Sequence, residues 1–209
     1  MSIGSRVRAM FGRHEPLIAN LWRSMFLDLD DWTATVRSWH PNPRRVLEVG
    51  CGEGYSTERL AAAFPDAQIV AIDIMPEVGR LYHGPEGRVD FRMQTAEALA
   101  AAEPAAFDLV IMCDVIHHVP EDIRASVLGS VRTLLAPDGR FAVKDWARSF
   151  SPIHWLCFGS DRWLTGDRVN FLKPDEARTL LAKVFGRDAV RTSAWIKPWP
   201  NNYAFLVQP

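Results

Sequence analysis

The stretch VLEVGCGEGYSTERL, residues 46–60, places glycine at three alternate positions, Gly50, Gly52 and Gly54, between a short apolar run and a helical pattern. Glycine has no Cβ atom, so it adopts positive φ angles and lets a ligand approach the main chain closely. A strand that ends in such a turn and leads into a helix presents backbone N–H groups and the positive end of the helix dipole. The stretch therefore predicts a loop against which a small ligand lies.

Acidic residues flank this loop. The dinucleotide-binding pattern GxGxxG needs a glycine where this chain has Tyr55. Glu48, just before the glycines, would repel a pyrophosphate but suits a cation such as an ammonium or a sulfonium. Asp73 ends the next apolar run, about 20 residues further on, where an acidic residue commonly binds ribose hydroxyls. The alternatives are a nicotinamide or flavin loop, and an Asp73 that only caps the following helix.

Short apolar runs alternate with helical patterns from residue 44 onward. Parallel strands joined by right-handed helical crossovers give this alternation, and continuous apolar runs suit strands covered on both faces. Strands are predicted over residues 44–49, 68–73, 88–93, 107–113 and 139–145. Helices are predicted over residues 14–40, 55–64, 76–82, 95–102, 121–135 and 174–185. Two further strands, 189–196 and 203–207, are predicted to form an antiparallel hairpin at the sheet edge.

Composition excludes several classes of protein. The 209 residues fit one domain, and a net charge of −1 provides no overall field toward nucleic acid or an anionic membrane. The three cysteines lie far apart, which argues against a disulfide framework or zinc site and favours a reducing, cytoplasmic location. No stretch has the length and hydropathy of a signal peptide or a membrane span. We therefore expect a cytoplasmic protein without nucleic-acid partners.

Four segments in register resemble the class I S-adenosylmethionine-dependent methyltransferases. They are VLEVGCGEG (46–54), IVAIDIMPE (69–77), FDLVIMCDVIHHVPE (107–121) and LLAPDGRFAV (134–143). The resemblance implies an α/β fold, a doubly wound, Rossmann-like sheet of seven mostly parallel strands with an antiparallel last strand and helices on both faces. It implies a methyltransferase domain over residues 44–209, with an aromatic insert at 146–173, preceded by an N-terminal helical lid segment, residues 1–43.

The resemblance also implies how S-adenosylmethionine binds. At the adenosine end, Asp73 would accept hydrogen bonds from the ribose hydroxyls and Ile74 would pack on the adenine. The family often places an aspartate at the adenine amine, where this chain has Thr95 or Ala96 instead.

At the methionine end, the implied contacts come from the glycine loop and from the end of the fourth strand. Glu48 would orient the amino group through water. The remaining contacts would come from Gly50, Cys51, Gly52, Cys113 and Asp114.

Methyl transfer from a sulfonium is an in-line displacement, so the protein must align the acceptor and, for a hydroxyl, remove its proton. Histidine titrates near neutrality and suits this role, which makes the pair His117 and His118 candidate bases. Asp145, after the fifth strand, is a third candidate, with the binding of a backbone N–H at the turn as the equal alternative. No metal is expected, because HHVPED lacks the spacing of a metal-binding helix. A metal-dependent site through Asp114 and Asp145 is the alternative.

Aromatic residues are concentrated in residues 146–173, more than core filling usually needs. We predict that they wall an apolar pocket for an aromatic or long-chain small molecule, with an arginine for a carboxylate or phosphate. Core packing against the N-terminal helices and a homodimer contact are the alternatives. The candidate substrate residues are Trp22, Trp146, Arg148, His154, Trp155 and Trp163.

The sequence therefore predicts an S-adenosylmethionine-dependent methyltransferase of small molecules, in specialised metabolism. Two other functions compete with it. One is methylation of RNA or protein, which the net charge and the absence of an Asn/Asp-Pro-Pro-Tyr/Phe element disfavour. The other is a non-methylating role on the same fold, as a cyclase or a binding protein.

Overall fold

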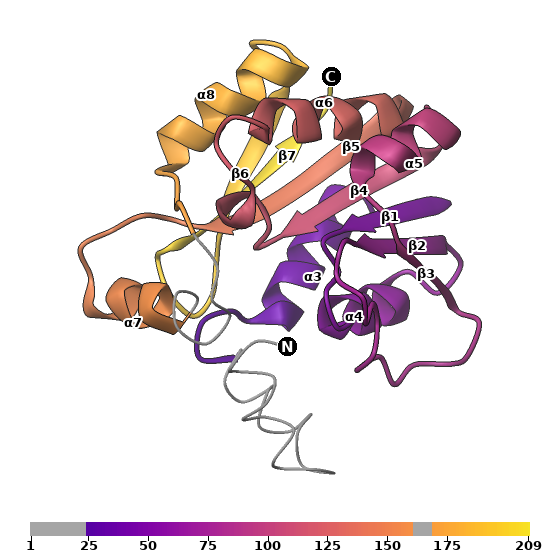
Figure 1. Ribbon diagram of the computed structural model, residues 1–209, viewed down its shortest axis with the longest axis horizontal. Helices are drawn as coiled ribbons and strands as arrows, with labels where there is room; N and C mark the ends of the chain where they lie inside the picture. The colour runs from indigo at the N-terminus through magenta and orange to yellow at the C-terminus, as the bar shows by residue number, and fades with distance from the viewer. Residues whose placement is uncertain (1–23, 161–168) are drawn as a thin grey trace.

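The computed structural model describes residues 24–160 and 169–209, and these residues form one seven-stranded sheet between two layers of helices (Figure 1). The strands are β1 (Arg45–Val49), β2 (Gln68–Asp73), β3 (Val89–Met93), β4 (Phe107–Cys113), β5 (Leu135–Trp146), β6 (Val190–Ile196) and β7 (Asn202–Val207). The helices are α3 (Leu29–Trp39), α4 (Tyr55–Ala63), α5 (Ala96–Ala102), η2 (Ile116–His118), α6 (Arg124–Leu134), α7 (Pro152–Ser160) and α8 (Pro174–Phe185).

The sheet has the strand order β3-β2-β1-β4-β5-β7-β6. The first five strands pair in parallel, so their carboxyl ends meet at one edge. β7 runs antiparallel to β5, and β6 completes the hairpin at the edge of the sheet. The order reverses between β1 and β4, and open α/β sheets bind their ligands beside such a reversal. The predicted fold and the edge hairpin are confirmed.

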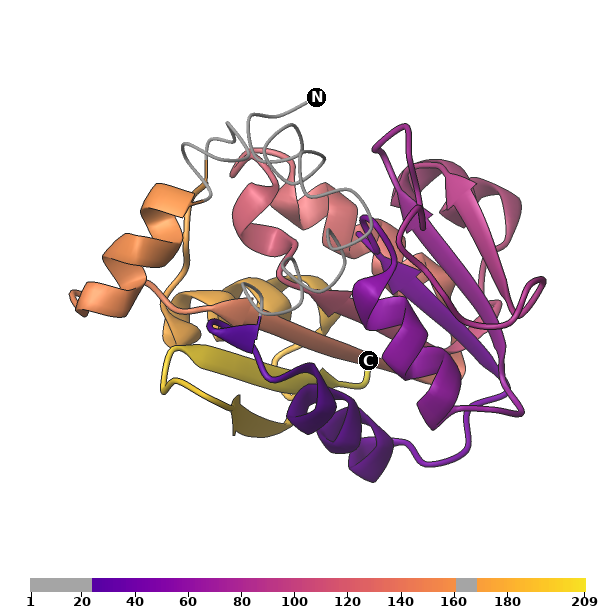
Figure 2. The same cartoon turned by 90° about the horizontal axis from the view of Figure 1, so that it is seen from below.

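Each face of the sheet has its own apolar core. On one face α5, α6 and α8 bury Leu99, Leu128 and Leu181 against the strands. On the other face α3 and α4 lie side by side (Figure 2) and bury Trp32 and Leu60. Trp32 is fully buried, so it is a core residue rather than part of a covering segment.

Three predicted helices differ from the structure. Residues 76–82 form turns instead of a helix, because Gly79 has a φ of +70° and its N–H bonds the carbonyl of Gly52, which holds this segment against the glycine loop. The prediction of a helix over 121–135 is too long, since α6 begins at Arg124 after a turn. The predicted helix over 14–40 is interrupted at Asp28, which caps α3, and its first part lies outside the described residues.

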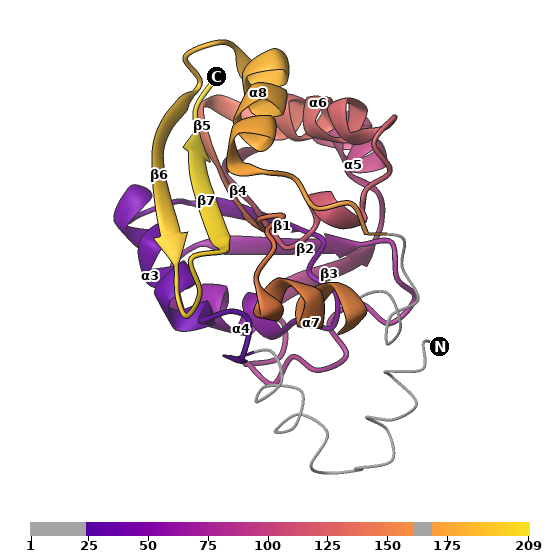
Figure 3. The same cartoon turned by 90° about the vertical axis from the view of Figure 1, so that its left-hand side faces the viewer.

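The segment before α3 is attached to the turn between β6 and β7 (Figure 3). The Asp28 N–H donates to the Lys197 carbonyl at 2.8 Å, and the Trp199 indole donates to the Met25 carbonyl at 2.6 Å. Asn202 donates from its side chain to the Phe26 carbonyl at 2.8 Å. None of the helices within residues 24–160 and 169–209 has the length and apolar character needed to cross a bilayer.

Candidate active site

The glycine loop between β1 and α4 lies at the reversal of the strand order. Gly50 has a φ of +77°, and a Cβ atom there would lie 2.4 Å from Cγ2 of Val115, in the loop after β4. Gly52 has a φ of +52°, but a Cβ atom there would meet nothing within 4 Å. Gly50 is therefore required for packing inside the protein, whereas Gly52 faces open space beside the main chain.

Asp73 links this loop to the end of β2. Its carboxylate accepts the Gly52 N–H at 2.8 Å and the Met75 N–H at 2.9 Å. The neighbouring Ile74 is 75% exposed and Met93, at the end of β3, is 67% exposed. A fixed carboxylate beside exposed apolar side chains at the end of β2 fits a nucleoside, with a polar sugar and a flat base.

Glu48 is almost completely buried beneath the loop. Its carboxylate accepts the Thr57 hydroxyl at 2.6 Å and also bonds the Ser56 hydroxyl, both on α4. Burial raises the pKa of Glu48, the hydrogen bonds from Ser56 and Thr57 offset part of that rise, and the charge of Asp73 adds to it. In this structure Glu48 joins β1 to the first turn of α4.

The other predicted cofactor residues lie around the same edge. Thr95 caps α5, where its hydroxyl oxygen accepts the Ala98 N–H at 3.2 Å, and Ala96 is buried in the core. Cys51 is buried in the glycine loop, and burial raises the pKa of its thiol. Cys113 ends β4 and is partly buried, so the predicted positions come together along one edge of the sheet.

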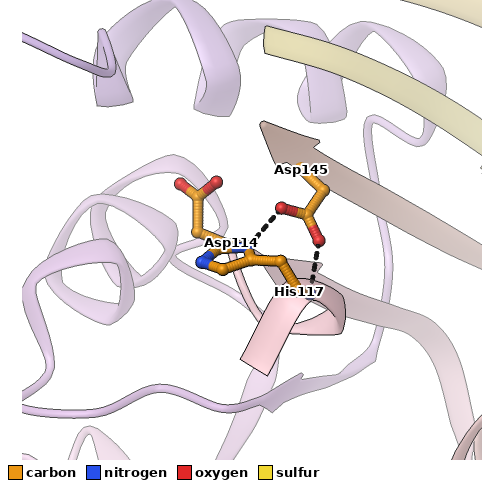
Figure 4. Close-up of side chains that lie close together, drawn as sticks. All are labelled: Asp114, His117 and Asp145. Carbon is orange, nitrogen blue, oxygen red and sulfur yellow. Dashed lines mark hydrogen bonds and ion pairs between the residues drawn. The ribbon is translucent and has the colours of Figure 1, made fainter. Parts of the chain in front are cut away.

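Asp145 and His117 form a buried pair at the carboxyl ends of β5 and β4 (Figure 4). Nδ1 of His117 lies 2.5 Å from Oδ1 of Asp145, and Oδ2 accepts the His117 backbone N–H at 3.0 Å. Burial would raise the pKa of Asp145, but the charge and hydrogen bond of His117, the Trp146 N–H and the charge of Lys144 together hold it below its usual value. An ionised Asp145 fixes the ring through Nδ1–H, which makes Nε2 the basic nitrogen of the neutral imidazole.

The structure separates the two histidines that the sequence left as a pair. The ring of His118 lies 4.1 Å from that of His117, but His118 is exposed whereas His117 is 4% exposed. Phe171 stacks on His117 with a centroid distance of 4.6 Å. His117 is therefore the histidine that the fold holds in one orientation.

Arg124, which the sequence analysis missed, holds Asn170, the neighbour of Phe171, next to His117. The Asn170 N–H donates to the His117 carbonyl at 2.9 Å. Arg124 is buried on α6 and donates to the carbonyls of Val119 at 2.9 Å and Asn170 at 2.6 Å. An arginine at the start of a predicted helix gave no signal of this role, because both of its partners are backbone carbonyls.

Lys144 and Asp114 form a second pair beside the first, and Lys144 was also missed. Nζ of Lys144 lies 2.8 and 2.7 Å from the two carboxylate oxygens of Asp114. Lys144 is 1% exposed, whereas the side chain of Asp114 is 32% exposed. Burial lowers the pKa of Lys144, but the charge and hydrogen bonds of Asp114, together with Cys113 and Asp145, outweigh burial and leave the pKa above its usual value. Asp114 has a φ of +56°, an uncommon conformation for a residue other than glycine.

One atom each from Asp114, His117 and Asp145 lie within 4.8 Å of one another, a spacing that a metal ion could use (Figure 4). The sequence prediction assigned no metal, with Asp114 and Asp145 as the alternative. In the structure the ammonium of Lys144 already bonds both oxygens of Asp114, and His117 already bonds both oxygens of Asp145. The carboxylates are thus satisfied by protein groups.

Four of the predicted substrate residues, Trp146, Arg148, His154 and Trp155, lie within the described part of the chain. Trp146 is buried, and its indole N–H donates to Nδ1 of His154 at 3.0 Å. Burial lowers the pKa of His154, and the charge of Arg148 lowers it further. Arg148 pairs with Glu176 of α8 at 2.6 Å.

Trp155 of α7 is 56% exposed, so it is the described tryptophan of this predicted set that faces outward. Trp22 and Trp163 lie outside the described residues. His154 uses Nδ1 as an acceptor, which makes it a weaker candidate for a base than His117.

Residues 47–141 match the family model of the methyltransferase domain. A ubiquinone biosynthesis O-methyltransferase of Xanthomonas euvesicatoria is 33% identical over 168 residues, which is 75% of this chain and 68% of that protein. An enzyme of the same name from Xylella fastidiosa is 38% identical over 122 residues, which is 56% of this chain and 48% of that protein.

Solved structures agree on the fold. The 1,6-didemethyltoxoflavin-N1-methyltransferase of Burkholderia thailandensis, with 1,6-didemethyltoxoflavin and S-adenosylhomocysteine bound, superposes with a TM-score of 0.67 at 18% identity. The match covers 97% of this chain and 86% of that one.

Proposed function

The chain belongs to the class I S-adenosylmethionine-dependent methyltransferase family, and from this membership we propose that it methylates an oxygen atom of a small aromatic acceptor. The accepting atom follows the relatives from Xanthomonas and Xylella, which are named O-methyltransferases. The observation that carries the proposal is the Asp145–His117 pair, whose oriented imidazole would act as the base. His117 follows Val115, the residue that contacts the glycine loop, by two positions.

Cofactor binding is assigned to the edge that contains the glycine loop. The open side of Gly52, the carboxylate of Asp73 and the exposed Ile74 fit an adenosine lying against the main chain. Asp73 would bind the ribose, Ile74 the adenine, and Thr95 or the Ala96 backbone the adenine amine. Glu48, Gly50, Cys51, Gly52, Cys113 and Asp114 would surround the methionine part. When bound, S-adenosylmethionine supplies an electrophilic methyl group on a sulfonium.

His117 is proposed as the general base. Nε2 would take the proton of the acceptor hydroxyl as that oxygen attacks, and the carboxylate of Asp145 would stabilise the imidazolium that forms. Phe171 and Arg124 would keep the ring in place during this transfer. His118 is exposed and would contribute less.

An aromatic acceptor is proposed from the side chains near the base. Phe171 stacks on His117 and meets His154 edge to face at 5.3 Å, so aromatic rings pack together beside the proposed base. Residues 1–43, apart from the core helix α3, would act as the lid segment and the insert 146–173 as the second cover. The candidate substrate residues are Trp22, Trp146, Arg148, His154, Trp155 and Trp163.

The test is incubation with methyl-labelled S-adenosylmethionine and a panel of phenols, matched amines and matched thiols. Label in a phenol supports the proposal, whereas label only in amines or thiols contradicts the assignment to oxygen. Label in RNA or protein from an extract would favour macromolecular methylation. Cofactor binding without transfer to any acceptor would favour a non-methylating role.

The base is tested by comparing His117→Gln with His118→Gln at saturating cofactor. We expect the first variant to lose at least a hundredfold in kcat and the second to change by less than tenfold. The opposite result would assign the base to His118.

A further inference from the structure

Lys144 carries the positive charge closest to the acidic residue at the end of β4. Its ammonium bonds both carboxylate oxygens of Asp114 from the interior of the protein. Lys144 is buried, whereas the Asp114 side chain is 32% exposed. Asp114 follows the last residue of β4, and Lys144 lies near the end of the neighbouring parallel strand β5. The Asp114 N–H also donates to the Lys144 carbonyl at 3.0 Å. The pair is thus built into the sheet rather than attached to its surface.

Asp114 lies on the β4 side of the glycine loop. The position of a Cβ atom on Gly50 is 2.4 Å from Val115, the residue after Asp114, so the loop and the end of β4 are in contact. In the proposed function the ribose binds Asp73 at the end of β2. The strand order β2-β1-β4 then leaves the rest of the cofactor to cross β1 toward Asp114. The sulfonium side of the cofactor would therefore approach the Asp114–Lys144 pair.

The methyl donor and the demethylated product of the cofactor differ in the charge on their sulfur atom. S-Adenosylmethionine carries a positive sulfonium, whereas S-adenosylhomocysteine carries a neutral thioether. An unpaired carboxylate would therefore bind S-adenosylmethionine more tightly than S-adenosylhomocysteine. An ammonium next to the carboxylate reduces this preference, because the electrostatic potentials of the two opposite charges nearly cancel at the sulfur.

We propose that Lys144 is a charge-balancing residue that sets the relative affinity of the site for S-adenosylmethionine and S-adenosylhomocysteine by neutralising Asp114. It acts through Asp114 and is a positioning residue, not a catalytic one. The proposal rests on the proposed function, because it requires that both nucleosides bind at the glycine loop.

The test is calorimetric measurement of the dissociation constants of both nucleosides. Lys144→Met leaves an unpaired carboxylate and should raise the ratio of the S-adenosylhomocysteine constant to the S-adenosylmethionine constant about tenfold. Asp114→Asn leaves an unpaired ammonium and should lower the same ratio by a similar factor. The double variant removes both charges and should return the ratio to within about threefold of the original.

Arg45→Met is the matched control, because Arg45 pairs with Glu103 at 2.7 Å near the opposite edge of the sheet. The ratio should not change in this variant. Removal of one partner of a buried ion pair can prevent folding, so circular dichroism accompanies each measurement. If Lys144→Met does not fold, Asp114→Asn and the double variant decide the question.

An unchanged ratio in the folded variants of the pair would overturn the proposal and leave Lys144 with a structural role. Such a result would not affect the proposed function. If the original protein bound neither S-adenosylmethionine nor S-adenosylhomocysteine, that result would instead contradict the proposed function itself.

Discussion

Nδ1 of His117 and Oδ1 of Asp145 lie 2.5 Å apart although the residues are 28 positions apart in the sequence. The parallel pairing of β4 with β5 brings them together, because both residues follow or end a strand at the same edge of the sheet. An Asp–His pair of this kind orients an imidazole for proton transfer. The topology therefore places the carboxylate of Asp145 where it holds the imidazole of His117 in one orientation.

Asp145→Asn should reduce kcat by about a hundredfold or more, with little change in the dissociation constant of S-adenosylmethionine. An amide in place of the carboxylate no longer enforces the Nδ1–H tautomer and does not stabilise an imidazolium. Single-turnover kinetics together with calorimetry would separate the two effects. Equal losses in both constants would indicate a structural defect instead.

Asp145 should also make the protein sensitive to acid. Its folded-state pKa lies below its usual value, so its ionised form contributes stability above the unfolded-state pKa of about 3.9, and that contribution is lost as the pH falls toward the folded-state pKa. Denaturant unfolding at pH 5, 4 and 3 should show the difference between the original protein and Asp145→Asn shrinking with each step. The exposed Asp66 provides the comparison, since Asp66→Asn should give a small difference throughout.

Glu48→Gln should stabilise the protein without cofactor by about 1 kcal/mol near pH 7, yet weaken binding of S-adenosylmethionine. The folded-state pKa of Glu48 is raised, so its effect on stability is most favourable below the unfolded-state pKa and declines as the pH rises. A neutral amide removes that decline. Thermal unfolding at pH 5 and pH 8 would measure it, and a destabilised variant at pH 8 would contradict the prediction.

Alanine at Gly50 should mainly reduce stability, whereas alanine at Gly52 should mainly reduce the affinity for S-adenosylmethionine. Gly50→Ala combines positive φ with a contact on Val115 and should destabilise the protein by about 3 kcal/mol. Gly52→Ala meets no protein atom, so it should lose only about 1 kcal/mol while losing most of its affinity for S-adenosylmethionine. Unfolding and calorimetry on both variants would test this. Full cofactor affinity in Gly52→Ala would place the ligand away from the loop.

Asp73→Ala should weaken S-adenosylmethionine by roughly thirtyfold or more, because hydrogen bonds to a charged acceptor contribute about 1.5–3 kcal/mol each. The variant also loses the acceptor for the Gly52 and Met75 N–H groups. Asp66→Ala serves as the control on the same protein. An unchanged affinity would show that the ribose binds elsewhere.

The sequence predicted β2 and β4 well because each contains an uninterrupted apolar run. It failed for residues 76–82, where the conformation depends on Gly79 packing against the glycine loop, a contact that no local pattern reveals. It also missed Lys144, which reads as an ordinary polar residue near the end of a strand. Its partner Asp114 is 30 positions away, and only the sheet register makes them neighbours.

Only part of the candidate site could be predicted, because long-range contacts are not visible in the sequence. Residue types at strand ends can be read from the sequence, but their hydrogen bonds cannot. Trp146 and Arg148 were predicted to line a substrate pocket because of their residue types. In the structure Trp146 donates to His154 inside the protein, and Arg148 pairs with Glu176. The cofactor and substrate roles, the lid segment and a homodimer stay predictions.

The hydrogen bonds between residues 25–28 and the turn at residues 197–202 have a consequence for biosynthesis. Trp199 is translated 174 positions after Met25, whose carbonyl it binds. The hydrogen bonds between residues 25–28 and this turn therefore form only after residues 197–202 have been translated. The turn between β6 and β7 thus completes the attachment of the segment that precedes α3.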